Sequence, residues 1–258
     1  MFSITQKYNC SKTNKKIKVK ERNIFSINPN EISSISIEIS ILNKFCSDEF
    51  LISILNWVKK WDIDIEFSLG DMLHRHNIYT HYLHTTGKLL ESSHCDILVE
   101  RMRKEWFEKN LKIINQELNG YKFKINKWED WLVHSKYKEV YNLLEDYVYS
   151  SNKHTLELER DIQRVSKKPL WLTGQDIEEK KKFLIQYMFE EITVYCLQNI
   201  NTTTLHIYPG GSSFLLKSLH SDEKCPLPLD NRKYINFTFR GEGQNSYQDL
   251  SDWLKIHE

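Results

Sequence analysis

The chain has 258 residues, 40% of them hydrophobic and 28% charged, which is typical of a globular protein with a sizeable core. Its formal net charge of +1 argues against a general polyanion-binding protein, so any nucleic-acid surface must be a local patch. Five scattered cysteines without a C-x-x-C pair argue against a disulfide framework or a zinc finger. With no apolar N-terminal segment and no stretch long enough to span a membrane, the sequence predicts a cytoplasmic protein with reduced thiols.

Residues 1–30 are polar and contain a basic run from Lys12 to Arg22. Such a run favours a solvated arm, or an edge strand whose lysines discourage pairing with other chains. Contact with phosphate groups is the less favoured alternative.

Segment 35–40 alternates apolar and polar residues with a period of two, which predicts a strand that ends in Ser40. A helical pattern over 48–60 and a second alternating strand over 63–68 follow it. This unit predicts two parallel strands joined by a right-handed crossover. Folds of this kind place their chemistry at the carboxyl edge of the sheet, so Ser40 is the first candidate site residue.

Four histidines follow the second strand: His74, His76, His81 and His84. Their spacing can in principle bind a metal ion, but they lack the convergent carboxylate or cysteine that most closed metal sites contain. We therefore expect no metal site here and interpret the segment as a polar loop or the start of a helix.

The rest of the chain continues to alternate helices and strands. Helices are expected over 93–117, 133–149, 153–166, 176–199 and 245–256, and strands over 121–125, 204–208 and 234–239. The pattern predicts a Rossmann-like, doubly wound α/β fold in a single domain spanning residues 1–258. The expected sheet has five mainly parallel strands, helices on both faces and a helical insertion.

The helix expected over 93–117 carries the densest basic cluster of any predicted helix. Acidic residues interrupt the cluster, and a mixed helix surface of this kind is usually salt-bridged and solvated. The basic residues are Arg101, Arg103, Lys104, Lys109 and Lys112.

Three more side chains lie where such a fold builds a site. Tyr187 and Glu191 are four residues apart on one face of a predicted helix, where a phenol and a carboxylate are costly to bury unless they are paired or used. Glu190 points elsewhere and is expected to be solvated. Tyr208 ends a predicted strand. Each of these residues, like Ser40, has an ordinary structural explanation when taken singly, and only their joint presence favours a site.

Five segments between residues 35 and 211 carry a resemblance to a known family. They are Glu38-Ile39-Ser40-Ile41-Leu42-Asn43, Gly70-Asp71-Met72-Leu73-His74-Arg75-His76-Asn77, Asn126-Lys127-Trp128-Glu129-Asp130-Trp131, Tyr187-Met188-Phe189-Glu190-Glu191 and Tyr208-Pro209-Gly210. With these motifs in this order, the chain resembles the tRNA-dependent cyclodipeptide synthases. Its Tyr-Pro pair looks like the branch of the family that has Tyr-Pro where the other branch has Tyr-His.

The resemblance implies a domain similar to the catalytic domain of class I tyrosyl- and tryptophanyl-tRNA synthetases. It further implies a monomer that uses two aminoacyl-tRNAs and needs no ATP or other cofactor. The chain agrees on ATP, because it has neither the synthetase His-x-Gly-His signature nor a Lys-Met-Ser-Lys-Ser loop. By this resemblance Ser40 is the nucleophile that forms aminoacyl- and dipeptidyl-enzyme intermediates. Tyr187 and Glu191 hold the α-ammonium group, Tyr208 assists cyclisation to the diketopiperazine, and the basic cluster contacts the tRNA acceptor arm.

The chain departs from the family at Glu38, where the family usually has glycine, and at Asn43, which the Tyr-Pro branch does not require. Strand alternation places Ser36 and Glu38 on the face of Ser40. The full set of expected pocket residues is Ser36, Glu38, Asn43, Val194, His206 and Pro209. This polar lining predicts that the first amino acid is small, polar or charged.

Rival functions remain open at this stage. A non-catalytic tRNA- or RNA-binding module would keep the basic helix without needing Ser40, Tyr187 and Glu191 together. A serine hydrolase is expected to have Gly-x-Ser-x-Gly, and the segment around Ser40 has no glycine. The sequence identifies no histidine base beside Ser40 and leaves the leaving ribose or phosphate as the proton acceptor. A histidine-rich metal hydrolase is the third alternative.

Overall fold

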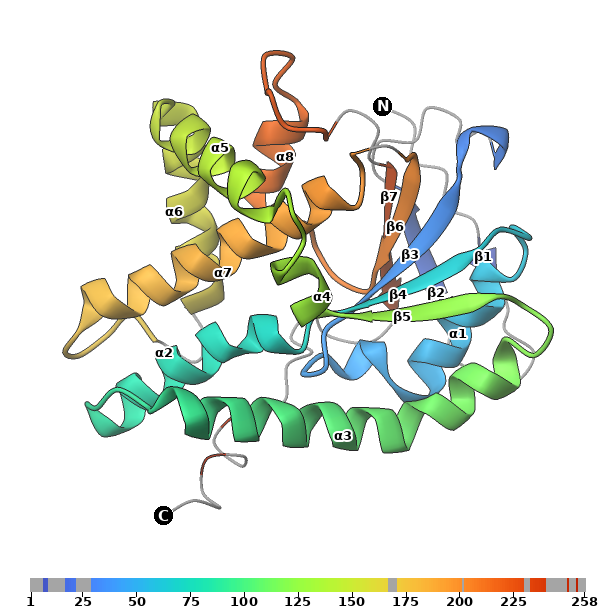
Figure 1. The fold of residues 1–258 in the computed structure, drawn as a ribbon, viewed down its shortest axis with the longest axis horizontal. Helices are drawn as coiled ribbons and strands as arrows, with labels where there is room; N and C mark the ends of the chain where they lie inside the picture. Colours follow the sequence, from blue (N-terminus) through green and yellow to red (C-terminus); the bar gives the residue numbers. More distant parts are fainter. Residues whose placement is uncertain are drawn as a thin grey trace.

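Seven strands form one sheet in the computed structural model of the protein, in the order β1-β2-β7-β6-β3-β4-β5 (Figure 1). The structure describes residues 7–8, 17–21, 29–166, 171–200, 202–229, 233–239, 250 and 254. The strands are β1 (Lys7–Tyr8), β2 (Ile17–Glu21), β3 (Ser34–Ile39), β4 (Ile65–Leu69), β5 (Phe123–Lys127), β6 (Thr204–Tyr208) and β7 (Lys233–Phe239). The α-helices are α1 (Asp48–Val58), α2 (Arg75–Thr86), α3 (Ser92–Glu117), α4 (Trp128–Leu132), α5 (Tyr137–Tyr149), α6 (Asn152–Ser166), α7 (Ile177–Leu197) and α8 (Phe214–His220). Short 3-10 turns are η1 (Pro29–Glu31), η2 (Lys44–Cys46) and η3 (Met72–His74).

The five strands from β7 to β5 run parallel to one another, which confirms the predicted Rossmann-like α/β class. β2 and β1 extend the sheet beyond β7 by antiparallel pairing, so the prediction of five strands was two short. Part of the basic N-terminal arm is therefore a strand. The remaining residues of the basic run, Lys12, Lys15, Lys16 and Arg22, lie outside the described residues, and so does most of the helix predicted over 245–256.

Strand β3 is buried on both faces. Ile35, Ile37 and Ile39 are at most 2% exposed on one face, while Ser36 and Glu38 are 1% and 4% exposed on the other. Parallel sheets carry helices on both sides, so neither face of a central strand meets water. The alternation in β3 thus separates an apolar core layer from a buried polar layer.

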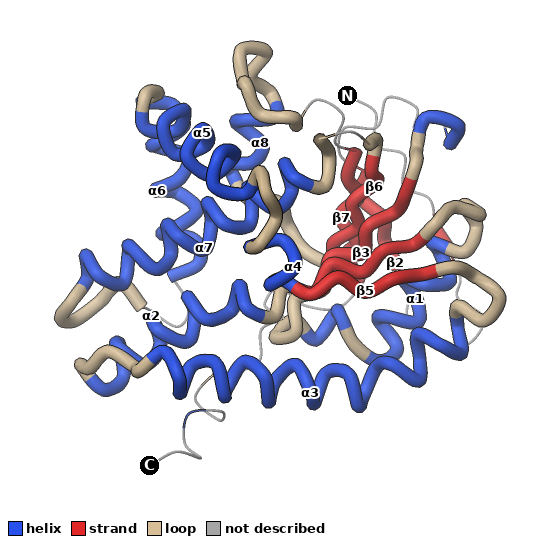
Figure 2. The backbone as a smooth tube through the Cα atoms, viewed as in Figure 1, coloured by secondary structure: helices blue, strands red, loops and turns tan. Residues whose placement is uncertain are grey.

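The helices surround the sheet in the manner predicted (Figures 1 and 2). α1 packs against α3 on one side, and α7 extends from the other. α5 and α6 form the helical insertion, with α5 packed along α7 and α6 against α8. The histidine-rich segment forms η3 and then the twelve-residue helix α2, which also packs along α7.

The sheet reverses its strand order at β3. The chain passes from β3 to β4 on one side, whereas β6 pairs with β3 on the other. In open α/β sheets this switch point, at the carboxyl ends of the strands, is where ligands bind. Ser40 directly follows β3, and Tyr208 is the last residue of β6, so both predicted site residues lie at this edge.

Candidate active site

A sharp turn after β4 brings His74 to Ser40. The Gly70 N–H donates to the carbonyl of Ile39 at 2.7 Å, and a Cβ atom at position 70 would lie only 3.3 Å from that oxygen. The η3 turn then places His74 Nε2 at 2.9 Å from Ser40 Oγ. Ser40 is 7% exposed and His74 is fully buried, so the pair is shielded from water.

The sequence identified no histidine base beside Ser40, but the structure places His74 there. The signal was present in the chain: Ser40 follows β3 and His74 follows β4, and these two strands are parallel neighbours. Asn77, one helical turn after His74, lies 3.1 Å from its Nδ1. Ser40, His74 and Asn77 therefore form a buried chain of polar contacts.

The protonation of His74 follows from its burial. Desolvation lowers the pKa of His74 to about 3, so the imidazole is neutral near neutral pH. In a neutral imidazole the partner of one nitrogen sets the role of the other. Asn77 Oδ1 has no hydrogen-bond partner among the described residues. As placed, the Asn77 Nδ2 amide donates to Nδ1, which makes Nε2 the protonated nitrogen that donates to Ser40 Oγ. A flip of the Asn77 amide puts Oδ1 at Nδ1–H instead, and the bare Nε2 then accepts the hydroxyl proton of Ser40.

Asn43 fastens the loop after Ser40 to the end of β6. Its amide donates to the Tyr208 hydroxyl at 3.3 Å and to the carbonyl of Pro209 at 3.0 Å, while its Oδ1 accepts from the backbone N–H of Phe45. These contacts orient the phenol of Tyr208 at the switch point. Asn43 thus holds two site loops together, a role that its predicted place in the pocket did not anticipate.

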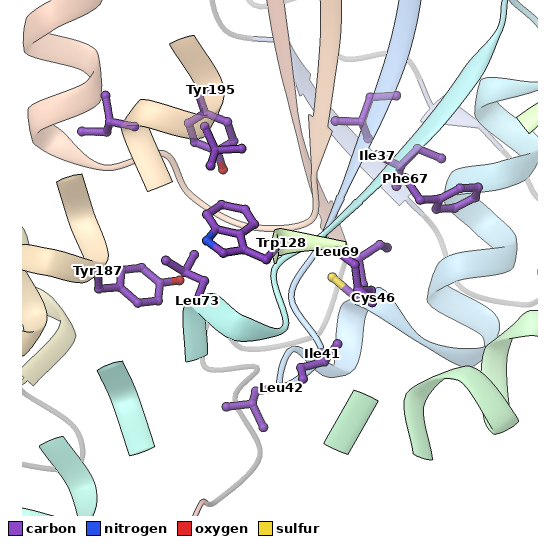
Figure 3. Packing of buried hydrophobic residues seen from close by; sticks show 14 of the residues in the cluster. Ile37, Ile41, Leu42, Cys46, Phe67, Leu69, Leu73, Trp128, Tyr187 and Tyr195 are labelled. Atoms are coloured by element: carbon purple, nitrogen blue, oxygen red, sulfur yellow. The ribbon is translucent and has the colours of Figure 1, made fainter. Parts of the chain in front are cut away.

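Helix α7 presents Tyr187, Glu191 and Tyr195 along one face. The ring of Tyr187 lies 6.3 Å from the ring of His74, measured between centroids. The Tyr195 hydroxyl donates to Glu191 Oε1 at 3.3 Å. Figure 3 shows Tyr187 reaching from α7 towards Leu73. Tyr187 therefore lies beside His74, while the phenol that binds Glu191 is that of Tyr195. The joint role of Tyr187 and Glu191 stays a prediction.

Glu190 was predicted to be solvated, and this prediction was wrong. It is 4% exposed and binds side chains from two other helices. Arg75 pairs with both carboxylate oxygens at 2.8 and 2.5 Å, His76 Nε2 lies at 3.1 Å, and Trp128 Nε1 donates at 2.7 Å. Burial alone raises the pKa of Glu190, but the hydrogen bond from His76 and the charge of Arg75 outweigh it and hold the pKa below its usual value. Glu190 ties α2, which follows His74, to α7.

A second buried polar network lies on the site face of β3. Glu38 Oε1 accepts from Ser36 Oγ and from His206 Nδ1, both at 2.9 Å. Asn199 donates to the other ring nitrogen of His206 at 2.9 Å. The register pairs Ser36 with His206 across β3 and β6, so strand alternation correctly placed these residues together. Val194, also predicted for the pocket, is completely buried.

The basic cluster on α3 is largely neutralised. Arg103, predicted to contact tRNA, is 6% exposed and forms ion pairs with Asp71, Glu129 and Glu100, so the structure contradicts this role. Its Nε lies 2.5 Å from Asp71, a buried carboxylate that also accepts the backbone N–H of Trp128. Arg103 therefore joins α3 to the ends of β4 and β5. It does not face solvent.

The other predicted phosphate contacts on α3 remain more accessible. Arg101 pairs with Glu105 at 3.4 Å, Lys104 with Glu108 at 3.9 Å and Lys109 with Asp48 at 2.6 Å. Lys112 is exposed too. Surface pairs of this kind contribute little to stability and can exchange a carboxylate for a phosphate.

The remaining histidines of the 74–84 segment do not converge. His76 contacts Glu190, and His81 Nδ1 accepts from Trp171 Nε1 at 3.3 Å. Within the described residues, no three His, Cys, Asp or Glu side chains are grouped so that they could hold a metal ion. No helix in the described part of the chain is both long and apolar enough to cross a membrane.

Comparison with known proteins places this site in a familiar fold. No protein-family model matches the chain, and no curated protein matches it. Solved structures do match. A cyclodipeptide synthase from Fluoribacter dumoffii superposes with a TM-score of 0.69 at 18% identity, covering 87% of this chain and 99% of that one.

Two further structures support the same fold. A Mycobacterium tuberculosis protein, whose structure relates cyclodipeptide synthetases to type I tRNA synthetases, has a TM-score of 0.62 at 11% identity over 87% of this chain and 93% of its own. A cyclodipeptide synthase from Candidatus Glomeribacter gigasporarum, bound to Phe-tRNAPhe, has a TM-score of 0.60 at 14% identity over 81% of this chain and 88% of its own. The resemblance inferred from the sequence motifs is thus confirmed at the level of the fold. The Tyr-Pro branch stays a prediction.

Proposed function

We propose that this protein is a tRNA-dependent cyclodipeptide synthase that joins two aminoacyl groups through intermediates on Ser40. The observation that carries the proposal is the buried Ser40–His74 pair at the switch point, with the ring of Tyr187, which shares a face of α7 with Glu191, 6.3 Å from the ring of His74. The fold that the chain shares with cyclodipeptide synthases supports the same reaction. We further propose that the enzyme acts as a monomer on two aminoacyl-tRNAs.

The first step is acyl transfer to the serine. An aminoacyl-tRNA ester is already activated, so a positioned nucleophile is sufficient and ATP is not needed. Ser40 Oγ attacks the ester carbonyl while its proton passes to His74 Nε2. The proton then goes to the departing 3′-terminal ribose oxygen, which leaves a neutral His74 and an aminoacyl-Ser40 ester. Because an imidazolium is disfavoured in this buried site, the proton is returned readily.

The second and third steps build the ring. Glu191 and Tyr187 hold the α-ammonium group of the residue on Ser40, and Glu191 removes its proton. The free amine attacks the ester of the second aminoacyl-tRNA, releasing that tRNA and leaving a dipeptidyl-Ser40. The amine of the newly added residue then attacks the Ser40 ester, which closes the diketopiperazine and frees the serine. Tyr208, oriented by Asn43, relays a proton in this last step.

The lining beside Ser40 supports a polar first residue. Glu38 presents a carboxylate on the face of Ser40, and Ser36 and His206 fix its position. A hydrogen-bond donor on the aminoacyl side chain would meet this carboxylate, whereas a large apolar side chain would desolvate it without compensation. We propose a first amino acid that is small, polar or cationic.

A serine hydrolase is the second candidate, and the Ser40–His74–Asn77 chain specifically favours it. Serine hydrolases use a histidine that a third side chain orients. Such an enzyme would let water, in place of a second amine, attack the aminoacyl-Ser40 ester. Its product would be a free amino acid.

The test separates these reactions by their products. The pure protein is incubated with a mixture of charged tRNAs without ATP, and products are identified by mass spectrometry, with Ser40→Ala in parallel. Cyclic dipeptides from the wild type only would support the proposal. Serine-dependent release of free amino acids alone would support a hydrolase. Bound tRNA without turnover in either protein would favour a binding module and overturn the proposed role of Ser40.

A further inference from the structure

A groove of about 540 Å³ lies on the surface between three helices. α7 forms its floor, and α2 and α5, which each pack along α7, form its walls (Figure 1). Six of its lining residues matter here: Arg75, Tyr79, Tyr137, Tyr141, Phe183 and Glu190. The reaction proposed above assigns no role to this groove.

The walls are aromatic. Tyr79 of α2 stacks on Phe183 of α7, with ring centroids 5.2 Å apart and planes 22° from parallel. Tyr137 and Tyr141 of α5 form a second pair at 6.0 Å and 31°. Two such pairs in one groove offer flat surfaces on which a planar group can stack, and unpaired nucleobases are recognised in this way.

The groove also offers hydrogen-bond donors and an exposed lysine. Burial, aided by nearby Glu190 and other phenols and carboxylates, raises the pKa of Tyr137 and raises that of Tyr141 to about 12, so both hydroxyls stay protonated. Neither hydroxyl has a hydrogen-bond partner within the described part of the chain, although both residues are half-buried. Arg75 also lines the groove but is paired there with Glu190, and Lys138, which is exposed, supplies a positive charge at the rim. Aromatic planes with unpaired donors and a cationic rim fit a nucleotide better than they fit an apolar ligand.

The groove borders the proposed active site. Arg75 is the residue after His74, and Gln186, which also lines the groove, is the residue before Tyr187. The groove is thus one residue along the chain from His74 and from Tyr187, which makes it a candidate site for nucleotides that precede a terminal ester held at Ser40. By contrast, most of the cations of α3 are already paired with carboxylates.

We propose that this groove binds an unpaired nucleotide of the tRNA 3′ end, one that precedes the aminoacylated adenosine. The proposal rests on the function proposed above and adds a contact that does not depend on the amino acid. The base stacks between the aromatic walls, its edge accepts hydrogen bonds from Tyr137 and Tyr141, and Lys138 lies near its phosphate.

The test compares variants that differ only in the groove. The double variant Tyr137→Phe/Tyr141→Phe removes the two hydroxyls and keeps the rings, and Tyr79→Leu removes a stacking plane. Each should raise the KM for aminoacyl-tRNA about tenfold, with kcat and product masses unchanged, since stacking and hydrogen bonding to a base are of this order. Tyr149→Phe on the same helix is the matched control, because Tyr149 is exposed outside the groove. Its KM should not change.

A direct binding measurement keeps the inference separate from the reaction. The trinucleotide CCA is titrated into the wild-type protein and into the double variant, and chemical shifts of the tyrosine rings are followed by NMR. Binding that the double variant loses would support the groove site, even if the wild type formed no cyclic dipeptide. If the wild type forms cyclic dipeptides while the groove variants keep a normal KM and CCA shifts no groove resonance, the inference is overturned and the proposed function stands.

Discussion

Replacing Glu190 by glutamine should destabilise the protein strongly, although the change is isosteric. The wild-type carboxylate accepts two hydrogen bonds from Arg75 and one each from His76 and Trp128. A glutamine side chain keeps one acceptor oxygen and turns the other position into an NH₂ donor, which faces donors already present. Arg75 is left without its counter-ion.

The size of the effect follows from burial. Glu190 is 5% exposed at its side chain and Arg75 is 21% exposed, so water replaces the lost partner poorly. Breaking one side of a buried ion pair costs roughly 3–5 kcal/mol. For a chain of this length, each kcal/mol lowers Tm by about 2–4 °C, so we expect a decrease of about 10 °C.

The assay is thermal unfolding followed by circular dichroism, with Glu191→Gln as the matched control. Glu191 is the neighbouring residue but is only half-buried and accepts from Tyr195. Glu191→Gln should change Tm by no more than about 2 °C, in line with surface substitutions, yet abolish cyclic dipeptide formation. Of these two adjacent residues, Glu190 would thus be needed for stability and Glu191 for catalysis. A Glu190→Gln variant with an unchanged Tm would refute the reasoning.

The pH dependence gives a second measurement on Glu190. The hydrogen bond from His76 and the charge of Arg75 hold the pKa of Glu190 in the folded protein below its ordinary value of 4.5. The unfolded chain therefore binds this proton more readily than the folded one. The stabilisation is complete above pH 4.5 and is lost as the pH falls through the folded pKa. The free energy of unfolding of Glu190→Gln should therefore fall less steeply than that of the wild type as the pH falls below 4.5.

Four further predictions concern the site and the surface of α3. Because burial lowers the pKa of His74 to about 3, the pH–rate profile of the wild type should show no inflection near pH 6.5. An inflection there that disappears in His74→Asn would mean that His74 titrates normally. Because of the same pKa shift, His74 takes up a proton below about pH 6.5 in the unfolded chain but not in the folded one, so the wild type loses stability as the pH falls from 6.5 to 4. His74→Asn should lose less, as measured by the free energy of unfolding in urea. Glu38→Gln, with Ser36→Ala as its control, should shift the products from polar towards apolar first residues in mass spectra of mixed-substrate reactions; an unchanged profile would remove Glu38 from the pocket. Charge reversal at the exposed Lys104 and Lys112 should raise the KM for tRNA several-fold and leave Tm unchanged, whereas Arg103→Met should lower Tm. The opposite pattern would mean that Arg103 contacts the RNA.

Local patterns were enough for much of the fold. The period-two alternation of 35–40, the helical pattern of 48–60 and the strand after it identified a parallel α/β unit, because such periodicities depend only on which face of an element meets the core. The same reasoning placed Ser36, Glu38 and His206 on one side of the sheet, and the structure joins them by hydrogen bonds. It was less successful for β2, because a lysine-rich segment is compatible with both an arm and a strand until it has a partner.

The amino-acid sequence by itself determined the parallel sheet, the edge at which Ser40 and Tyr208 lie and the face that Tyr187 and Glu191 share. Only the tertiary structure decided which polar side chains are paired. His74 meets Ser40 because β3 and β4 are neighbours, and Glu190 is buried because Arg75, His76 and Trp128 converge on it. Arg103 lies inside because three carboxylates surround it. The sequence pattern around a charged residue is the same whether its side chain faces water or a buried partner. Contacts between distant segments provide the free energy that favours the buried position over the exposed one.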